Sequence, residues 1–192
     1  MGKRKSECMM NTKEFQFTLV LAAIALVVFR LYPQVNFWRL TKPSSIRPFY
    51  LTLEPGSTLG ILGATIAGPI AGLILGLVAW NPVFPLEVLI IVKVSQFFTI
   101  GYLHRKIQPP YDVLAVPLGF LISAIVHPTL VHYILYKQVI VHLYWGTNIV
   151  FQATANFIFY ILVRLVIPQV YGWANPGVDR SLKLPFLKNR SK

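Results

Sequence analysis

The residues most suited to binding chemistry are a few polar side chains that interrupt long apolar stretches of the sequence. Lys93 follows Ile-Ile-Val and lies about eight residues inside an expected helix over 85–103. An ammonium group at that depth is costly unless a ligand or a counter-charge neutralises it. We therefore expect Lys93 either to contact a bound substrate or to form an ion pair with an acidic residue such as Glu54 or Glu87.

A second set of polar side chains forms a stripe in an expected helix over 141–170. Asn148, Gln152 and Asn156 recur every four residues, and Trp145 shares their face. At 100° per residue, these four side chains occupy an arc of about 80°. Amides on one face predict contact with the interior of a helix bundle, where they bind a ligand or hydrogen-bond to neighbouring helices.

Histidines provide a third candidate group. His127 and His132 are five residues apart in an expected helix over 111–136, so they point about 140° apart and cannot face one small site. His127 precedes Pro128, which frees a backbone carbonyl, and is the better candidate ligand contact; a packed, hydrogen-bonded histidine is the alternative. The four histidines and the single Cys8 lack metal-ligand spacing, and we expect no metal and no cofactor.

Motifs of common enzymes are missing from the sequence. It contains no Gly-x-x-x-x-Gly-Lys-[Ser/Thr] phosphate loop, no His-Glu-x-x-His and no Gly-x-Ser-x-Gly. We therefore expect a protein that is not an enzyme, with a reaction through His127 and Lys93 as the remaining enzymatic alternative.

The composition indicates the elements that position these residues. Of the 192 residues, 55% are hydrophobic and 12% charged, against about 45–50% apolar and about 25% charged in soluble domains. A single helix over 51–80 would be about 45 Å long, beyond the roughly 30 Å hydrocarbon core, so we expect a break at Gly68-Pro69. The prediction is an all-α bundle of six transmembrane helices in a domain over 14–170, flanked by basic tails over 1–13 and 171–192. The six helices are expected at 15–32, 51–67, 69–81, 85–103, 111–136 and 141–170.

The net charge of +12 comes from basic residues that flank the apolar stretches, which indicates membrane orientation and no nucleic-acid partner. With six spans and a cytoplasmic N-terminus, 11 Lys and Arg residues lie inside and 5 outside. Five spans with an external N-terminus give the same count but keep the overlong helix. We therefore expect a multi-pass protein of the cell membrane with both termini in the cytoplasm.

The segment Gly60-Ile-Leu-Gly-Ala-Thr-Ile-Ala-Gly-Pro-Ile-Ala-Gly-Leu-Ile-Leu-Gly76 places Gly68, Gly72 and Gly76 on one helix face, where small residues allow close helix packing. A long first loop precedes it, and Asn81-Pro-Val-Phe-Pro85 and Gly101-Tyr-Leu-His-Arg-Lys106 follow. Together these features over about 10–170 resemble the substrate-binding (S) subunit of energy-coupling-factor (ECF) vitamin transporters.

The resemblance implies a subunit that captures a small water-soluble vitamin or micronutrient. Lys93, His127 and Asn148 lie at similar depths in their expected helices, about seven to nine residues from the outer surface, which places the site in the outer half of the bundle. The resemblance also implies partners: a transmembrane coupling subunit, two ATPase subunits and the lipid bilayer. Cobalt and nickel members of the family begin Met-His, whereas this chain begins Met1-Gly2, so no metal cargo is expected. The candidate substrate-binding residues are Lys93, His127, Asn148, Gln152, Asn156, Glu54, Glu87 and Trp145.

The resemblance further implies a gating loop and a docking helix. The loop over 33–49 carries Trp38, Arg39, Lys42 and Arg47, which either close over the substrate or anchor the loop at the membrane interface. Lys93 and these basic residues suggest an anionic substrate group. In place of the family's Ala-x-x-x-Ala pattern the first helix has Leu21-Ala-Ala-Ile-Ala25, which makes Ala22 and Ala25 the candidate contacts with the coupling subunit. A membrane scaffold or assembly protein with a similar bundle is the alternative function.

Overall fold

The computed structural model describes residues 10–31, 35–39, 50–79, 86–130 and 141–166. These residues form six α-helices, one short 3-10 helix and one two-stranded hairpin, so the predicted mainly helical fold class is confirmed. The helices are α1 (Thr12–Leu31), α2 (Pro55–Ala67), α3 (Pro69–Val78), α4 (Leu86–Lys106), α5 (Ala115–Leu130) and α6 (Val141–Val166), with η1 (Tyr111–Leu114) before α5 and strands β1 (Val35–Arg39) and β2 (Tyr50–Leu53) between α1 and α2.

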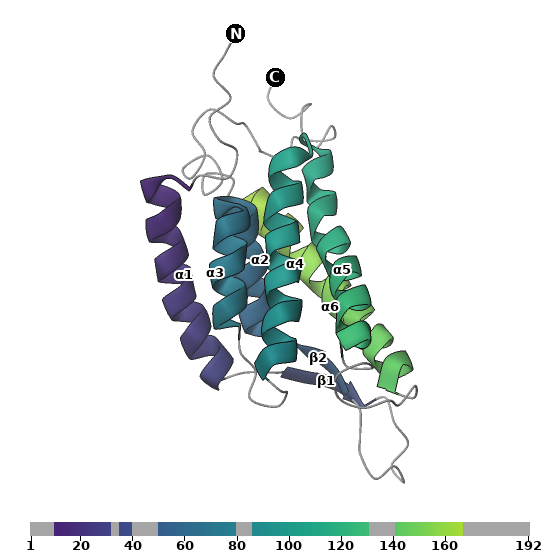
Figure 1. Ribbon diagram of the computed structural model, residues 1–192. Coiled ribbons are helices and arrows are strands. Elements are labelled where there is room, and N and C mark those ends of the chain that lie inside the picture. The colour runs from purple at the N-terminus through teal and green to yellow at the C-terminus, as the bar shows by residue number, and fades with distance from the viewer. Residues whose placement is uncertain (1–9, 32–34, 40–49, 80–85, 131–140, 167–192) are drawn as a thin grey trace.

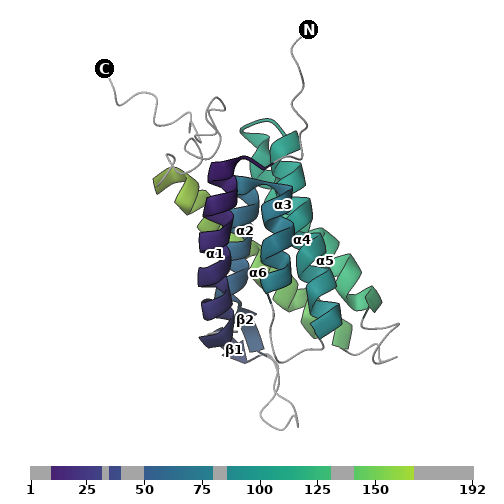
Figure 2. The same ribbon diagram turned by 60° about the vertical axis from the view of Figure 1, so that its left-hand side comes forward.

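Successive helices run up and down, which gives the bundle two distinct ends (Figure 1). The start of α1, the break between α2 and α3, the end of α4 and the end of α6 lie at one end, which we name the termini end. The β-hairpin lies at the other, which we name the hairpin end (Figures 1 and 2). Helix α3 packs on α4, α4 packs on α5, and α6 crosses the bundle obliquely.

The start of α1 is fixed by reciprocal capping. Asn11 Oδ1 accepts a hydrogen bond from the Glu14 backbone N–H at 2.8 Å, and Glu14 Oε2 accepts one from the Asn11 N–H at 2.8 Å. Such a capping box satisfies two backbone donors that have no partner within the helix. The expected boundary at residue 15 is therefore three residues late.

The predicted break at Gly68-Pro69 is confirmed. Gly68 has a φ of +87°, which favours glycine, and Pro69 occupies the first turn of α3, where its missing N–H leaves no bond unmade. The break packs tightly on α4: a Cβ on Gly101 would lie 2.6 Å from the Gly68 carbonyl carbon. The close packing expected of the glycine stripe is also present, because a Cβ on Gly76 would lie 2.6 Å from Val94 Cα.

The hairpin corrects the expectation of a helix beginning at residue 51. Strand β2 continues to Leu53 and pairs antiparallel with β1, with a register shift between Asn36 and Trp38. Proline disfavours the helical conformation in the residue before it, and Glu54 before Pro55 is extended at φ −104° and ψ 100°. The second helix therefore begins at Pro55.

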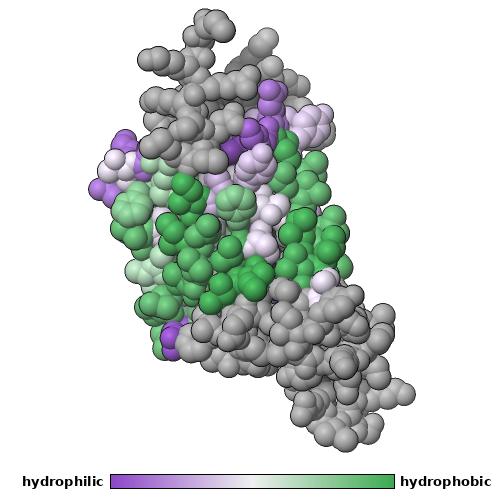
Figure 3. Space-filling model, viewed as in Figure 1, coloured by the Kyte–Doolittle hydropathy of each residue, from purple (hydrophilic) through white to green (hydrophobic). Residues whose placement is uncertain are grey.

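The surface of the bundle exposes many large apolar side chains, whereas its interior contains several charged ones. Large apolar side chains are exposed on α1, α3, α5 and α6, for example Val20, Leu77, Leu121 and Leu162. Figure 3 shows one face on which they form a band, with hydrophilic residues concentrated toward the termini end. Two segments of the described chain, Thr12–Leu31 and Thr147–Val166, are long and apolar enough to cross a membrane.

Candidate binding site

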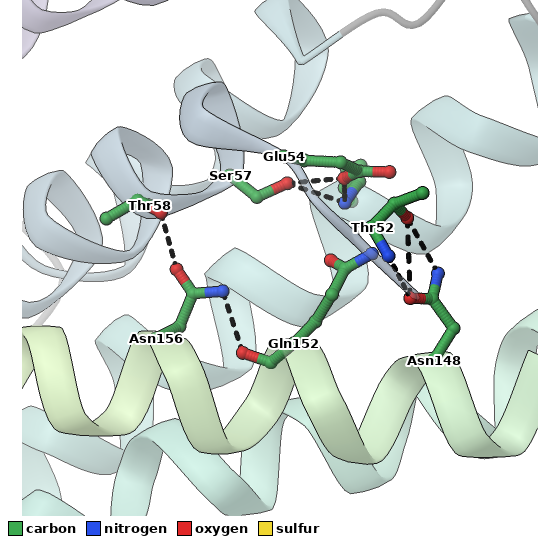
Figure 4. A network of polar contacts seen from close by, with 8 residues as sticks. Thr52, Glu54, Ser57, Thr58, Asn148, Gln152 and Asn156 are labelled. Atoms are coloured by element: carbon green, nitrogen blue, oxygen red, sulfur yellow. Dashed lines mark hydrogen bonds and ion pairs between the residues drawn. The ribbon is translucent and has the colours of Figure 1, made fainter. Parts of the chain in front are cut away.

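Eight polar side chains meet between β2, α2, α4 and α6 (Figure 4). Strand β2 and its extended link to α2 supply two of them, the first turns of α2 supply two, α4 supplies one, and α6 supplies three. We name this set the hairpin-end cluster; its members are Thr52, Glu54, Ser57, Thr58, Lys93, Asn148, Gln152 and Asn156.

A charge-neutral triad lies within the hairpin-end cluster. Lys93 Nζ forms an ion pair with Glu54 Oε2 and donates a hydrogen bond to Ser57 Oγ at 2.7 Å. Ser57 Oγ donates to Glu54 Oε2 at 2.7 Å. None of the three residues is more than 6% exposed. The ion pair with Glu54, one of the two roles expected for Lys93, is therefore confirmed, while contact between Lys93 and a substrate stays a prediction.

The amides of α6 face inward, as their spacing predicts, but they contact β2 and α2. Asn148 Oδ1 accepts from the Thr52 backbone N–H at 2.9 Å, and its Nδ2 donates to Thr52 Oγ1 at 3.0 Å. Asn156 Oδ1 accepts from Thr58 Oγ1 at 2.6 Å, and its Nδ2 donates to the Gln152 carbonyl at 2.8 Å. Helix α6 is thus tied to the hairpin and to α2 by its amide stripe.

Two buried glutamines retain unused hydrogen-bonding capacity. Gln152 is 7% exposed, and its side chain forms no hydrogen bond within the described residues; it extends from α6 on the side that faces the triad (Figure 4). Gln96 lies one turn after Lys93 on the buried face of α4 and is 1% exposed, and within the same part of the chain its Nε2 has no partner. A buried polar group without a partner costs about 1–3 kcal/mol, so such groups commonly mark a place for a ligand or water. Sequence reasoning missed Gln96, although a polar residue three positions after Lys93 was a usable signal.

A second buried polar group lies at the termini end. Arg164 Nη1 donates to Asp112 Oδ1 at 2.8 Å and to the Tyr160 hydroxyl at 3.0 Å, and His104 Nε2 lies 2.8 Å from that hydroxyl and 3.4 Å from Asp112 Oδ2. All four residues are 0% exposed. We name them the termini-end cluster. The sequence analysis missed it, although an acid and a base of opposite charge inside two expected helices were visible.

Arg105 joins three elements beside this cluster. Its Nη2 donates to Glu14 Oε1 at 2.6 Å and to the carbonyl of Ala67 at 2.9 Å. The guanidinium therefore satisfies a carbonyl at the end of α2 and links it to the start of α1.

Several candidate residues have side chains beyond what the structure describes. Glu87, His127 and Trp145 lie in α4, α5 and α6, and Trp38 and Arg39 lie in β1, but only their backbone is described; Lys42 and Arg47 lie outside the described residues. Ala22 is half-buried, whereas Ala25 is 1% exposed and packs in the core. The side chain of Ala25 is thus enclosed by this chain and not presented to another subunit.

An apolar groove of about 700 Å³ lies between α1, α2 and α6. Ile24, Val28, Leu59 and Phe159 line it, and Thr58 contributes a hydroxyl already bonded to Asn156. The groove offers few hydrogen-bonding groups, so the hairpin-end cluster is the better site for a polar molecule.

Among the described residues, no three His, Cys, Asp or Glu side chains are grouped as a metal site. Comparisons of the chain with known protein families, with curated proteins and with solved structures found no match. The candidate site therefore depends on its own geometry.

Proposed function

We propose that this chain is a membrane-embedded subunit that captures a small water-soluble molecule in the hairpin-end cluster. The observation that carries the proposal is the buried Gln152 side chain, which faces a neutral ion-paired triad without a hydrogen bond to the described residues, inside a bundle that exposes many large apolar side chains. A soluble domain places its charges on the surface, whereas a bilayer favours apolar side chains outside and polar side chains facing the bundle interior.

The proposal includes six membrane spans with both termini in the cytoplasm. The alternating directions of the six helices support it, because they bring the start of α1 and the end of α6 to the same end (Figure 1). Helices α2 and α3, at 13 and 10 residues, are short for a span of about 20 residues. Their close packing on α4 across the glycine stripe supports a pair of short spans held against a longer helix.

Cysteine labelling tests this topology. In a Cys8→Ser background, Gln108→Cys at the termini end should be labelled by an impermeant reagent only after cells are permeabilised. Ser44→Cys, between the two strands, should be labelled in intact cells. Labelling of Gln108→Cys from outside contradicts the six-span arrangement.

The hairpin is suited to gating access to the site. Thr52 of β2 holds both ends of the Asn148 amide. Movement of the hairpin would release this amide for a ligand. Strand β1, which bears Trp38 and Arg39, is paired with β2 and is proposed to move with it. Lys42 and Arg47 stay sequence-based candidates for the same gate.

Transport in this proposal requires a coupling subunit and two ATPase subunits, as in the ECF transporters that the sequence resembles. Purification from native membranes should recover these three proteins. A molecule extracted from the purified chain should be identified by mass spectrometry, and Asn148→Ala should reduce its recovery about tenfold, as expected for a lost buried hydrogen bond. Thr154→Val, on the exposed face of α6, is the matched control. Recovery of no small molecule and no ATPase contradicts the proposal.

A membrane scaffold is the alternative, and one observation favours it. Most members of the hairpin-end cluster bond to one another, as Asn156 does to Thr58 and Lys93 to Glu54. Recovery of cell-envelope assembly proteins without an ATPase would support the scaffold.

A further inference from the structure

We infer that the hairpin-end cluster selects an uncharged polar molecule bearing a hydrogen-bond acceptor such as a carbonyl or ring nitrogen; this inference rests on the proposed function. Two observations carry it. The buried ionisable side chains described at this end, Glu54 and Lys93, are paired with each other, and the hydrogen-bonding capacity left over among the described residues belongs to neutral amides.

The charge balance is the first observation. Among the described residues, Glu54 and Lys93 are the buried ionisable side chains at the hairpin end, and they are paired with each other. A carboxylate ligand that took Lys93 would leave the Glu54 carboxylate, which is 5% exposed, without its counter-charge. A cationic ligand that bound Glu54 would likewise leave the Lys93 ammonium without its counter-charge. Because an unpaired buried charge is strongly unfavourable, the triad as built disfavours ligands of either sign.

The unused amides are the second observation. Gln96 Nε2 and the side chain of Gln152 come from α4 and α6, the helices that bear Lys93 and Asn148. An amide donor is satisfied by a neutral acceptor and needs no counter-charge. A site with buried donors rejects a molecule that lacks the matching acceptor, because the donors then stay unpaired. The amides therefore supply selectivity that the triad does not.

This inference replaces the anionic substrate group suggested by the sequence. That suggestion relied on Lys93 as a free cation and on the basic residues of the loop over 33–49, whose side chains lie outside what the structure describes. The structure pairs Lys93 with Glu54 and Ser57. The triad remains useful to a neutral ligand because it fixes the start of α2 against α4.

Matched pairs of compounds that differ in charge test the inference. The full-length chain in detergent is dialysed to equilibrium against a mixture of nicotinamide and nicotinate, pantothenol and pantothenate, and biotinamide and biotin, and bound compounds are measured by mass spectrometry. We expect an uncharged member to be enriched at least about tenfold over its carboxylate partner. Gln152→Leu should abolish this enrichment, and Thr154→Val should preserve it.

Charge variants make the test specific to the triad. Glu54→Gln leaves Lys93 without its counter-charge and should shift preference toward the carboxylate member. The double variant Glu54→Gln/Lys93→Met restores neutrality and should return preference to the uncharged member, even where the single variant folds poorly. Enrichment of a carboxylate by the unmodified chain overturns the inference and leaves the proposed function intact. Enrichment of no uncharged probe also overturns it, and the proposed function is then decided separately by the molecule extracted from native membranes.

Discussion

The two ends of the bundle both bury an ion pair, but they differ in what surrounds it. At the termini end, Arg164 bonds to Asp112 and Tyr160, and His104 lies within hydrogen-bonding distance of the same hydroxyl. At the hairpin end, the Glu54–Lys93 pair is faced by the Gln152 side chain, which forms no hydrogen bond with the described residues. Buried atoms without a hydrogen bond among the described residues are not confined to the hairpin end, because Asp112 Oδ2 and Arg164 Nη2 are two of them. Those two atoms belong to ion-paired groups, whereas Gln152 carries a neutral amide, so the discriminating feature is a neutral amide that faces the ion pair.

The difference agrees with the elements that each cluster joins. The termini-end cluster links α4, η1 and α6, and Arg105 adds α1 and α2, so this end is held as one unit. The hairpin-end cluster depends on β2, a short strand whose Thr52 holds Asn148. One end is suited to stability and the other to rearrangement around a ligand.

Removing the arginine of the termini-end cluster should have the largest effect. Arg164→Met leaves the fully buried Asp112 without its cationic partner, and breaking a buried pair destabilises by about 3–5 kcal/mol. We expect the free energy of unfolding in mixed detergent micelles to fall by about that amount. The double variant Asp112→Asn/Arg164→Met should recover part of the loss. An unchanged free energy of unfolding would show that the Arg164–Asp112 pair does not stabilise the termini end.

Separating the triad at the hairpin end should have a smaller effect. Lys93→Met leaves Glu54 without its ion-pair partner but retains the Ser57 hydrogen bond, so we expect a loss of about 2–3 kcal/mol. Glu54→Gln/Lys93→Met should lose less than the single variant, because no buried charge remains. The free energy of unfolding in mixed detergent micelles is measured for both variants. If Glu54→Gln/Lys93→Met were less stable than Lys93→Met, the triad would not be neutralised by its own residues as described.

A smaller loss is expected from the packing around the helix break. Gly101→Ala brings a Cβ within 2.6 Å of the Gly68 carbonyl carbon, and such overpacking costs about 1–3 kcal/mol. Thermal unfolding in detergent should show the loss, and Thr129→Ala, at an exposed position of α5, should not. Equal stability of the two variants would mean that the break does not need close contact with α4.

Much of the fold could be predicted because its determinants are local. The helix break could be predicted from Gly68-Pro69 alone, because glycine readily adopts the positive φ found at Gly68 and proline has no backbone N–H to continue a helix. The hairpin could not be predicted in this way, because β2 has only four residues and forms by pairing with β1, which lies elsewhere in the sequence. The distinguishing signal was Pro55, which keeps Glu54 out of the helix.

The candidate site was predictable in part for the same reason. The spacing of Asn148, Gln152 and Asn156 places them on one face whatever they contact. Their partners Thr52 and Thr58 are 96 and 98 residues away in sequence, and no local pattern specifies such pairs. The pairing of Arg164 with Asp112 across 52 residues has the same origin.

The smallest effect on stability is expected at Gln152, and it separates the two ends most sharply. Its side chain is buried without a hydrogen bond among the described residues, so Gln152→Leu removes no hydrogen bond from that part of the chain. The free energy of unfolding should stay the same or rise by about 1 kcal/mol, unlike the loss at Arg164. Stabilisation by nicotinamide, pantothenol or biotinamide, whichever the unmodified chain binds, should disappear in this variant. A loss of 3 kcal/mol or more, roughly that of a broken buried pair, would mean that Gln152 supports the fold as the termini-end cluster does, and the contrast between the two ends would then fail.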